Sequence, residues 1–163
     1  MNKFRRLHRD ELEEIKPQFI KFLALNGYDS SSWEKVKQDD LTQANQLIDQ
    51  FSQIVFSGVI DRMEYLIQRS NKDIRTYHCL PGKIRMLGLL VEGETNLDLR
   101  QVDLPAQEMM KQVRQSGAAV KLYSGERAYR AGDRQRDVFL LMEQGALISD
   151  GELFSILEEV SKA

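Results

Sequence analysis

The side chains best suited to chemistry are concentrated in the segment from Lys121 to Arg136, which reads KLYSGERAYRAGDRQR. Arginine binds phosphate or carboxylate groups through two parallel hydrogen bonds, and tyrosine stacks on nucleobases or fills a protein interface. The segment therefore predicts a surface for another protein or for an anionic, single-stranded partner. The candidate binding residues are Lys121, Tyr123, Arg127, Tyr129, Arg130, Arg134 and Arg136.

An extended backbone over 120–130 would divide these side chains between two faces, because successive residues of a strand point to opposite sides. Arg127 would then share a face with Lys121 and both tyrosines, if no bulge forms at Gly125, and Arg130 would point away. The structural alternative is that the tyrosines cover a sheet edge while the arginines pair with the acidic residues of 137–163. We favour this alternative, and among functional roles we favour protein binding over nucleic-acid binding.

Other chemistry finds little support in the sequence. His8, His78 and Cys79 are the only histidines and cysteine, whereas a zinc site needs three or four such ligands. His78 and Cys79 are adjacent on a predicted strand, so their side chains diverge. No nucleophile elbow and no phosphate-binding glycine loop occurs. We therefore predict no metal, no cofactor and no catalytic residue, although a carboxylate-based enzyme site would leave no recognisable spacing.

Composition predicts an ordinary soluble protein. The 163 residues are 42% hydrophobic and 29% charged, with a net charge of −2 that marks neither a nucleic-acid nor a membrane binder. Length predicts one compact α+β domain over 1–163, with 1–9 as a flexible basic arm. The single cysteine suits a reducing cytoplasm, and no apolar run is long enough to span a membrane.

The N-terminal half is predicted to be helical. Apolar residues spaced by three and four over 10–25 indicate an amphipathic helix, which Pro17 kinks or restarts. Ser31 and Glu34 have the spacing of a capping box, which predicts a short helix carrying Trp33. A longer helix follows from Asp39 or Asp40, and its end falls within 61–66.

The second half is predicted to contain a small antiparallel sheet packed by helices. Pro81-Gly82 forms the turn of a hairpin over 74–91, and 65–69 adds a third strand. A helix follows over 105–115, and then a strand over 119–123 that Gly125 breaks. A C-terminal pair of helices closes the chain, the second of them capped by Ser149.

Three stretches carry a family resemblance: LHRDELEE, FSQIVFSGVIDRMEYL and LYSGERAYRAGDRQRDVFLLMEQGALISDGELF. Through them the chain resembles a small family of cytoplasmic proteins of similar length and unknown function from Bacteroidetes-type bacteria. The resemblance implies no activity and no site residues.

Together these observations favour a non-enzymatic protein-interaction or regulatory module, whose partner is another protein or a second copy of the chain. Binding of RNA or single-stranded nucleic acid through 121–136 is the alternative, and an enzyme with an unrecognised carboxylate site is the third hypothesis.

Overall fold

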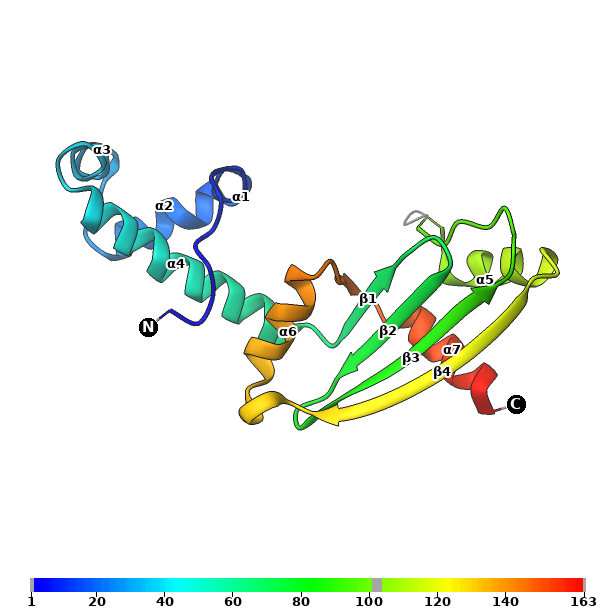
Figure 1. Ribbon diagram of the computed structural model, residues 1–163. Coiled ribbons are helices and arrows are strands. Elements are labelled where there is room, and N and C mark those ends of the chain that lie inside the picture. Colours follow the sequence, from blue (N-terminus) through cyan, green and yellow to red (C-terminus); the bar gives the residue numbers. More distant parts are fainter. Residues whose placement is uncertain (1, 101–103, 163) are drawn as a thin grey trace. The chain divides into compact units, whose positions relative to one another are not determined.

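The computed structural model describes residues 2–100 and 104–162, which confirm the predicted α+β class. They divide into two compact units, Met1–Asp61 and Arg62–Ala163. The first unit is helical, and the second is built around a five-stranded antiparallel sheet (Figure 1). The single-domain architecture over 1–163 remains a prediction from length.

The first unit consists of α1 (Arg9–Glu14), α2 (Lys16–Leu25), α3 (Ser30–Asp39) and α4 (Leu41–Arg62). The predicted helix over 10–25 restarts at Ile15, which leaves Pro17 in the first turn of α2, where proline costs no hydrogen bond. Asp29 caps α3 instead of Ser31, because its carboxylate accepts the Ser32 amide at 2.8 Å. Phe19 and Leu23 of α2 bury against Leu47 and Phe51 of α4 in the core of this unit.

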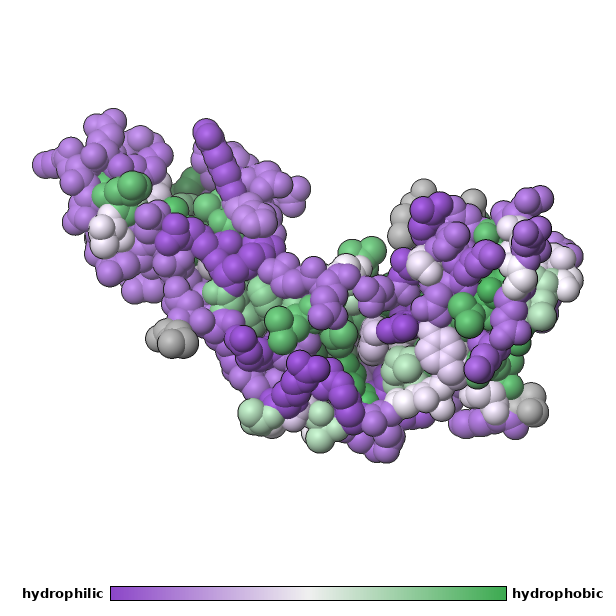
Figure 2. Space-filling model, in the orientation of Figure 1, coloured by the Kyte–Doolittle hydropathy of each residue, from purple (hydrophilic) through white to green (hydrophobic). Residues whose placement is uncertain are grey.

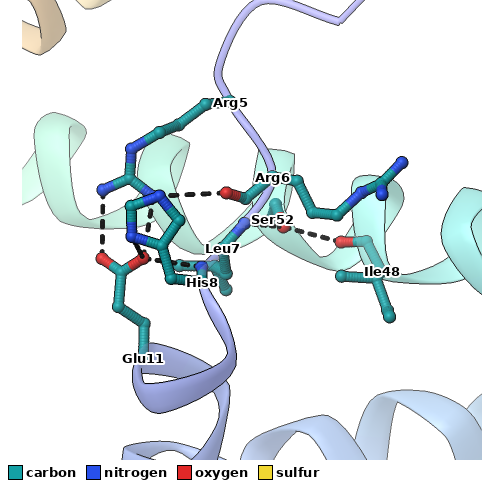
Figure 3. A network of polar contacts seen from close by, with 7 residues as sticks. All are labelled: Arg5, Arg6, Leu7, His8, Glu11, Ile48 and Ser52. Carbon is teal, nitrogen blue, oxygen red and sulfur yellow. Dashed lines mark hydrogen bonds and ion pairs between the residues drawn. The ribbon is translucent and has the colours of Figure 1, made fainter.

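The chain before α1, for which we predicted a flexible basic arm, lies along α4 in its described residues. Phe4 and Leu7 are buried, and the Leu7 amide donates to Ser52 Oγ at 2.8 Å. Ser52 Oγ in turn donates to the Ile48 carbonyl at 2.7 Å (Figure 3). Two of the cations in this stretch are therefore held in place: Arg6 pairs with Asp49 at 2.7 Å, and Arg5 with Glu11 at 2.8 Å.

Replacing Glu11 by glutamine is expected to lower the free energy of unfolding by about 1 kcal/mol at pH 7, and by less as the pH falls. Hydrogen bonds from Arg5, which outweigh burial, lower the pKa of Glu11 from 4.5 to about 2. A folded-state pKa below the unfolded one gives stability that is present above pH 4.5 and is lost as the pH falls toward 2. Urea unfolding at pH 7 and pH 3 measures this difference. The control variant Glu14→Gln replaces an exposed side chain and should show no such difference in stability between the two pH values. A Glu11→Gln variant that lowers the free energy of unfolding equally at both pH values would contradict the lowered pKa of Glu11.

The second unit places five strands in the order β4-β3-β2-β1-β5. The strands are β1 (Tyr65–Arg69), β2 (Asp73–Cys79), β3 (Lys83–Glu92), β4 (Ala119–Ala128) and β5 (Leu147–Ser149). The predicted hairpin and third strand are confirmed as β2, β3 and β1. The short β5 was not predicted, and because Ser149 ends this strand it does not cap the last helix.

Helices α5 (Ala106–Gln115) and α7 (Glu152–Lys162) cover one face of the sheet. Met109 and Val113 of α5 and Leu157 of α7 pack there against Leu87 and Leu89 of β3. Helix α6 (Arg134–Glu143) follows β4 after a short 3-10 turn, Arg130–Gly132. No helix in the described part of the chain is both long and apolar enough to cross a membrane.

Strand β4 is longer than predicted, since it runs through Gly125 to Ala128. Gly125 is paired with Met86, and every residue of β4 has a partner on the ten-residue strand β3. The prediction that Gly125 breaks the strand was wrong because pairing with β3 overrides the weak local preference of glycine.

Candidate functional site

The segment Lys121–Arg136 falls into two parts in the structure. Its first part is the edge strand β4, where Lys121, Tyr123 and Arg127 lie on one face of the sheet. Its second part is the 3-10 turn and the start of α6, which carry Arg130, Arg134 and Arg136. The strand rises by about 3.3 Å per residue, so Lys121 lies roughly 20 Å from Arg127. Lys121 therefore does not share a patch with Arg127 at the other end of the strand.

Arg127 is engaged inside the molecule by the carboxylate of Asp137. Its Nη1 donates to Asp137 Oδ2 at 2.6 Å, and the Arg130 amide donates to the same oxygen at 2.9 Å. Asp137 is only 3% exposed. Burial raises the pKa of this carboxyl, but these hydrogen bonds more than offset that effect and the net shift is downward. Asp137 is thus a charged anchor between α6 and the end of β4.

Tyr129 and Arg134 are also used internally. The hydroxyl of Tyr129, a residue 5% exposed, donates to the Leu80 carbonyl at 2.6 Å. Burial raises the pKa of Tyr129 to about 12, so the phenol stays protonated. Arg134 Nη2 donates to the carbonyls of Met63 at 2.8 Å and Cys79 at 3.2 Å. Both side chains satisfy backbone carbonyls at the ends of β1 and β2, which is a structural role.

Tyr123 lies flat across the sheet, over Gly88 of β3. A Cβ atom added to Gly88 would overlap the tyrosine ring, so only glycine permits this approach. The Tyr123 hydroxyl donates to Asp73 and accepts from Arg75 Nε at 3.3 Å. Burial, followed by the hydrogen bond to Asp73, raises the pKa of Tyr123 to about 12. The ring thus covers the face opposite α5 and α7 and does not project as a stacking platform.

Four of the seven predicted residues are exposed: Lys121, Arg127, Arg130 and Arg136. Arg127 is paired with Asp137, whereas the side chains of the other three make no ion pair among the described residues. The sequence did not reveal which of these cations bond inside the molecule, because this depends on where Asp137 and the backbone carbonyls of Met63 and Cys79 lie in the fold. The spacing between Arg127 and Asp137 carries no local signal of their pairing.

The most distinctive feature of this region is the free edge of β4. The Val91 amide donates to the Lys72 carbonyl at 2.7 Å, so the odd-numbered residues of β3 bond to β2 and the even-numbered ones to β4. Because even-numbered residues of β3 lie opposite odd-numbered residues of β4, the backbone N–H and C=O groups of the odd-numbered residues of β4 point toward β3. The backbone N–H and C=O groups of its even-numbered residues point outward, away from the sheet. These are Val120, Leu122, Ser124, Glu126 and Ala128.

The two sheet edges differ in length. Strand β5 has three residues, whereas β4 has ten. Within the described residues, no backbone group of the chain bonds to the outward amides of β4. This edge can accept a further strand. The sequence did not reveal the full length of this free edge, because the predicted strand stopped before Gly125.

Among the described residues, the buried charged side chain is that of Asp137, and Arg127 neutralises it. No group of three or more histidine, cysteine or acidic side chains in residues 2–100 and 104–162 could hold a metal ion. Burial raises the pKa of the Cys79 thiol to about 11, which keeps it in the unreactive protonated form.

Comparison with known proteins matches nearly the whole chain to one family. A family model described as a family of unknown function matches residues 1–162. No curated protein and no solved structure matches the chain.

Proposed function

The chain belongs to that family of unknown function, DUF6495, and we propose that it is a non-enzymatic protein-interaction module that pairs β4 with an extended segment of a partner protein. The observation that carries the proposal is the free edge of β4, a strand of ten residues. Strand addition to such an edge is a recurrent mode of peptide recognition, in which backbone hydrogen bonds supply affinity and alternate side chains supply specificity.

The edge supports a partner strand with alternating aliphatic and acidic residues. Val120 and Leu122 lie on the same side of the sheet as Leu89 and Val91, with which they pair in register. Lys121 lies on the opposite side of the sheet and is exposed. A cross-strand pair of opposite charge, or of two apolar side chains, contributes roughly 0.2–1 kcal/mol. A partner strand with a carboxylate opposite Lys121 would form the charge pair, and aliphatic residues on its other face would pack beside Val120 and Leu122.

The competing functions have less support. Nucleic-acid binding would draw on cations gathered in one groove, but Arg127 and Arg134 are engaged internally and Lys121 lies far from Arg130 and Arg136. Pairing with a second copy through β4 would bring Lys121 and Arg127 of both chains onto one face, and edge lysines oppose such pairing. An enzyme site is favoured by a buried acid or base with an unsatisfied charge, whereas the buried carboxylate Asp137 is already paired with Arg127.

The Ser124→Pro variant tests the proposal, because Ser124 directs its amide outward and proline removes that amide without removing a β3–β4 hydrogen bond. We expect a partner captured from native lysate by the natural chain and by Ser124→Ala to be lost at least tenfold with Ser124→Pro. Circular dichroism should show that all three proteins are folded.

Two results would overturn the proposal. One is equal capture by Ser124→Pro and Ser124→Ala. The other is capture that disappears after nuclease treatment or in the double variant Arg130→Ala/Arg136→Ala, since these outcomes would assign binding to nucleic acid or to the exposed arginines. Capture of a second copy of this chain alone would replace the proposed partner with self-association.

The proposal extends to where the protein works. A cytoplasmic location is supported by the single cysteine, Cys79, which is buried and free. A bacterial origin rests on the family resemblance in sequence.

A further inference from the structure

Gly125 leaves a gap in the row of side chains along the free edge of β4. The residue is exposed, and an atom placed at its missing Cβ position would meet Met86 Cε at 3.7 Å, an ordinary van der Waals distance. Its φ lies outside the positive range, so the backbone does not require glycine here. The gap is therefore open space at the sheet edge.

The neighbouring side chains on this face of the sheet leave the gap open. Tyr123 lies across β3, and Arg127 reaches Asp137 in α6. Neither Tyr123 nor Arg127 comes within 4 Å of the missing Cβ position. Met86 of β3 is half-buried and lies opposite Gly125 in the register, so its thioether borders the gap.

A strand added antiparallel to β4 would bring a side chain close to this gap. The backbone groups of Gly125 point toward β3, so the partner residue opposite it would form a non-hydrogen-bonded pair, the kind in which side chains lie closest. An aromatic residue across from a glycine in an edge strand covers the exposed backbone. Its ring would also reach Met86, and sulfur packs favourably against aromatic rings.

The exposed cation Lys121 sets the register of such a strand. It lies four residues before Gly125 on the same face, and its side chain makes no ion pair in the part of the chain that the structure describes. In an antiparallel partner the order is reversed, so an acidic residue opposite Lys121 would follow the aromatic residue by four positions.

The surface over the strands contains no continuous apolar patch in the view of Figure 2. Hydrophobic and hydrophilic side chains are mixed there, over the strands that Figure 1 labels. Recognition at this edge would therefore depend on single positions, of which Gly125 offers space and Lys121 offers charge.

We propose that the partner strand pairs antiparallel with β4 and carries an aromatic residue opposite Gly125 and an acidic residue four positions later, opposite Lys121. This inference rests on the proposed function, because it specifies the side chains of the strand that β4 binds. Gly125 is then a specificity-determining position, since its missing side chain admits the ring.

NMR titration with the synthetic peptide Thr-Phe-Thr-Thr-Val-Glu-Val-Thr tests the inference. We expect the amide signals of Leu122 and Ser124 to shift, and the peptide with alanine in place of phenylalanine to bind about threefold more weakly. Gly125→Val should abolish this difference, because its methyl groups fill the gap. Gly125→Ala, which adds only the Cβ, should reduce it. Ser124→Val is the matched control: it places the same side chain on the other face and should keep the difference.

The outcomes separate this inference from the proposed function. Shifts at Leu122 and Ser124 with equal affinities for the two peptides would overturn the aromatic preference and leave strand addition standing. A difference that persists in Gly125→Val, or that Ser124→Val also abolishes, would overturn the role of Gly125. Equally tight binding of Thr-Glu-Thr-Thr-Val-Phe-Val-Thr would overturn the antiparallel register. If no peptide shifted the amides of β4, both the inference and strand addition would be wrong.

Discussion

The Arg127→Ala variant is expected to unfold with a free energy about 2 kcal/mol below that of the natural chain. Removal of one partner of a buried ion pair leaves an uncompensated charge, and Asp137 is 3% exposed. The full cost of such a loss is reduced here because the Arg127 side chain is 42% exposed and the Arg130 amide continues to bond the carboxylate. The pKa of Asp137 should rise in the variant, because burial is then opposed by fewer hydrogen bonds.

Urea unfolding followed by far-UV circular dichroism measures the effect of Arg127→Ala. The fluorescence of Trp33 is not suitable, since this residue belongs to the first unit. Lys121→Ala is the matched control: Lys121 lies on the same strand and the same face, but it is exposed, and its replacement should change stability by less than about 0.5 kcal/mol. Equal stabilities of the two variants would show that Arg127 is not a structural residue.

The Gly151→Ala variant is expected to lose about 2–4 kcal/mol of stability through two separate effects. Gly151 has φ +86°, a backbone conformation that costs alanine energy in any surroundings. An added Cβ would also lie 2.6 Å from ring atoms of Tyr65. That ring cannot easily move aside, because His78 is stacked on it with centroids 4.4 Å apart and the Phe154 ring lies 5.6 Å away.

Gly117→Ala separates the two effects. Gly117 has φ +69°, but an added Cβ would meet nothing within 4 Å, so only the backbone cost of about 1 kcal/mol applies. Thermal unfolding of both variants gives the comparison. A Gly151→Ala protein as stable as Gly117→Ala would mean that Tyr65 does not pack tightly on Gly151.

The sequence predicted elements whose signals are local. The periodicity of α4 and the Pro81-Gly82 turn of the β2–β3 hairpin both lie within the segments that they shape. The full length of β4 depends on pairing with β3, whose first residue, Lys83, lies opposite Ala128 at the end of β4. Short β5 likewise exists only because β1 offers it an edge.

In the candidate site, too, local features were predictable from the sequence and contacts between distant residues were not. Local composition indicated that Lys121–Arg136 is chemically unusual, and its strand alternation was predictable. The engagement of Arg127 by Asp137 and of Arg134 by the Met63 and Cys79 carbonyls was not, since these partners meet only in the folded chain.

Amide hydrogen exchange along β4, measured by NMR with and without the captured partner, tests the central claim most directly. In the free protein we predict fast exchange at Leu122 and Ser124, whose amides point outward, and slow exchange at Tyr123 and Gly125, whose amides bond to β3. Binding of the partner should slow Leu122 and Ser124 to the level of their neighbours. Outward amides that remain fast while the partner is bound would contradict strand addition at this edge.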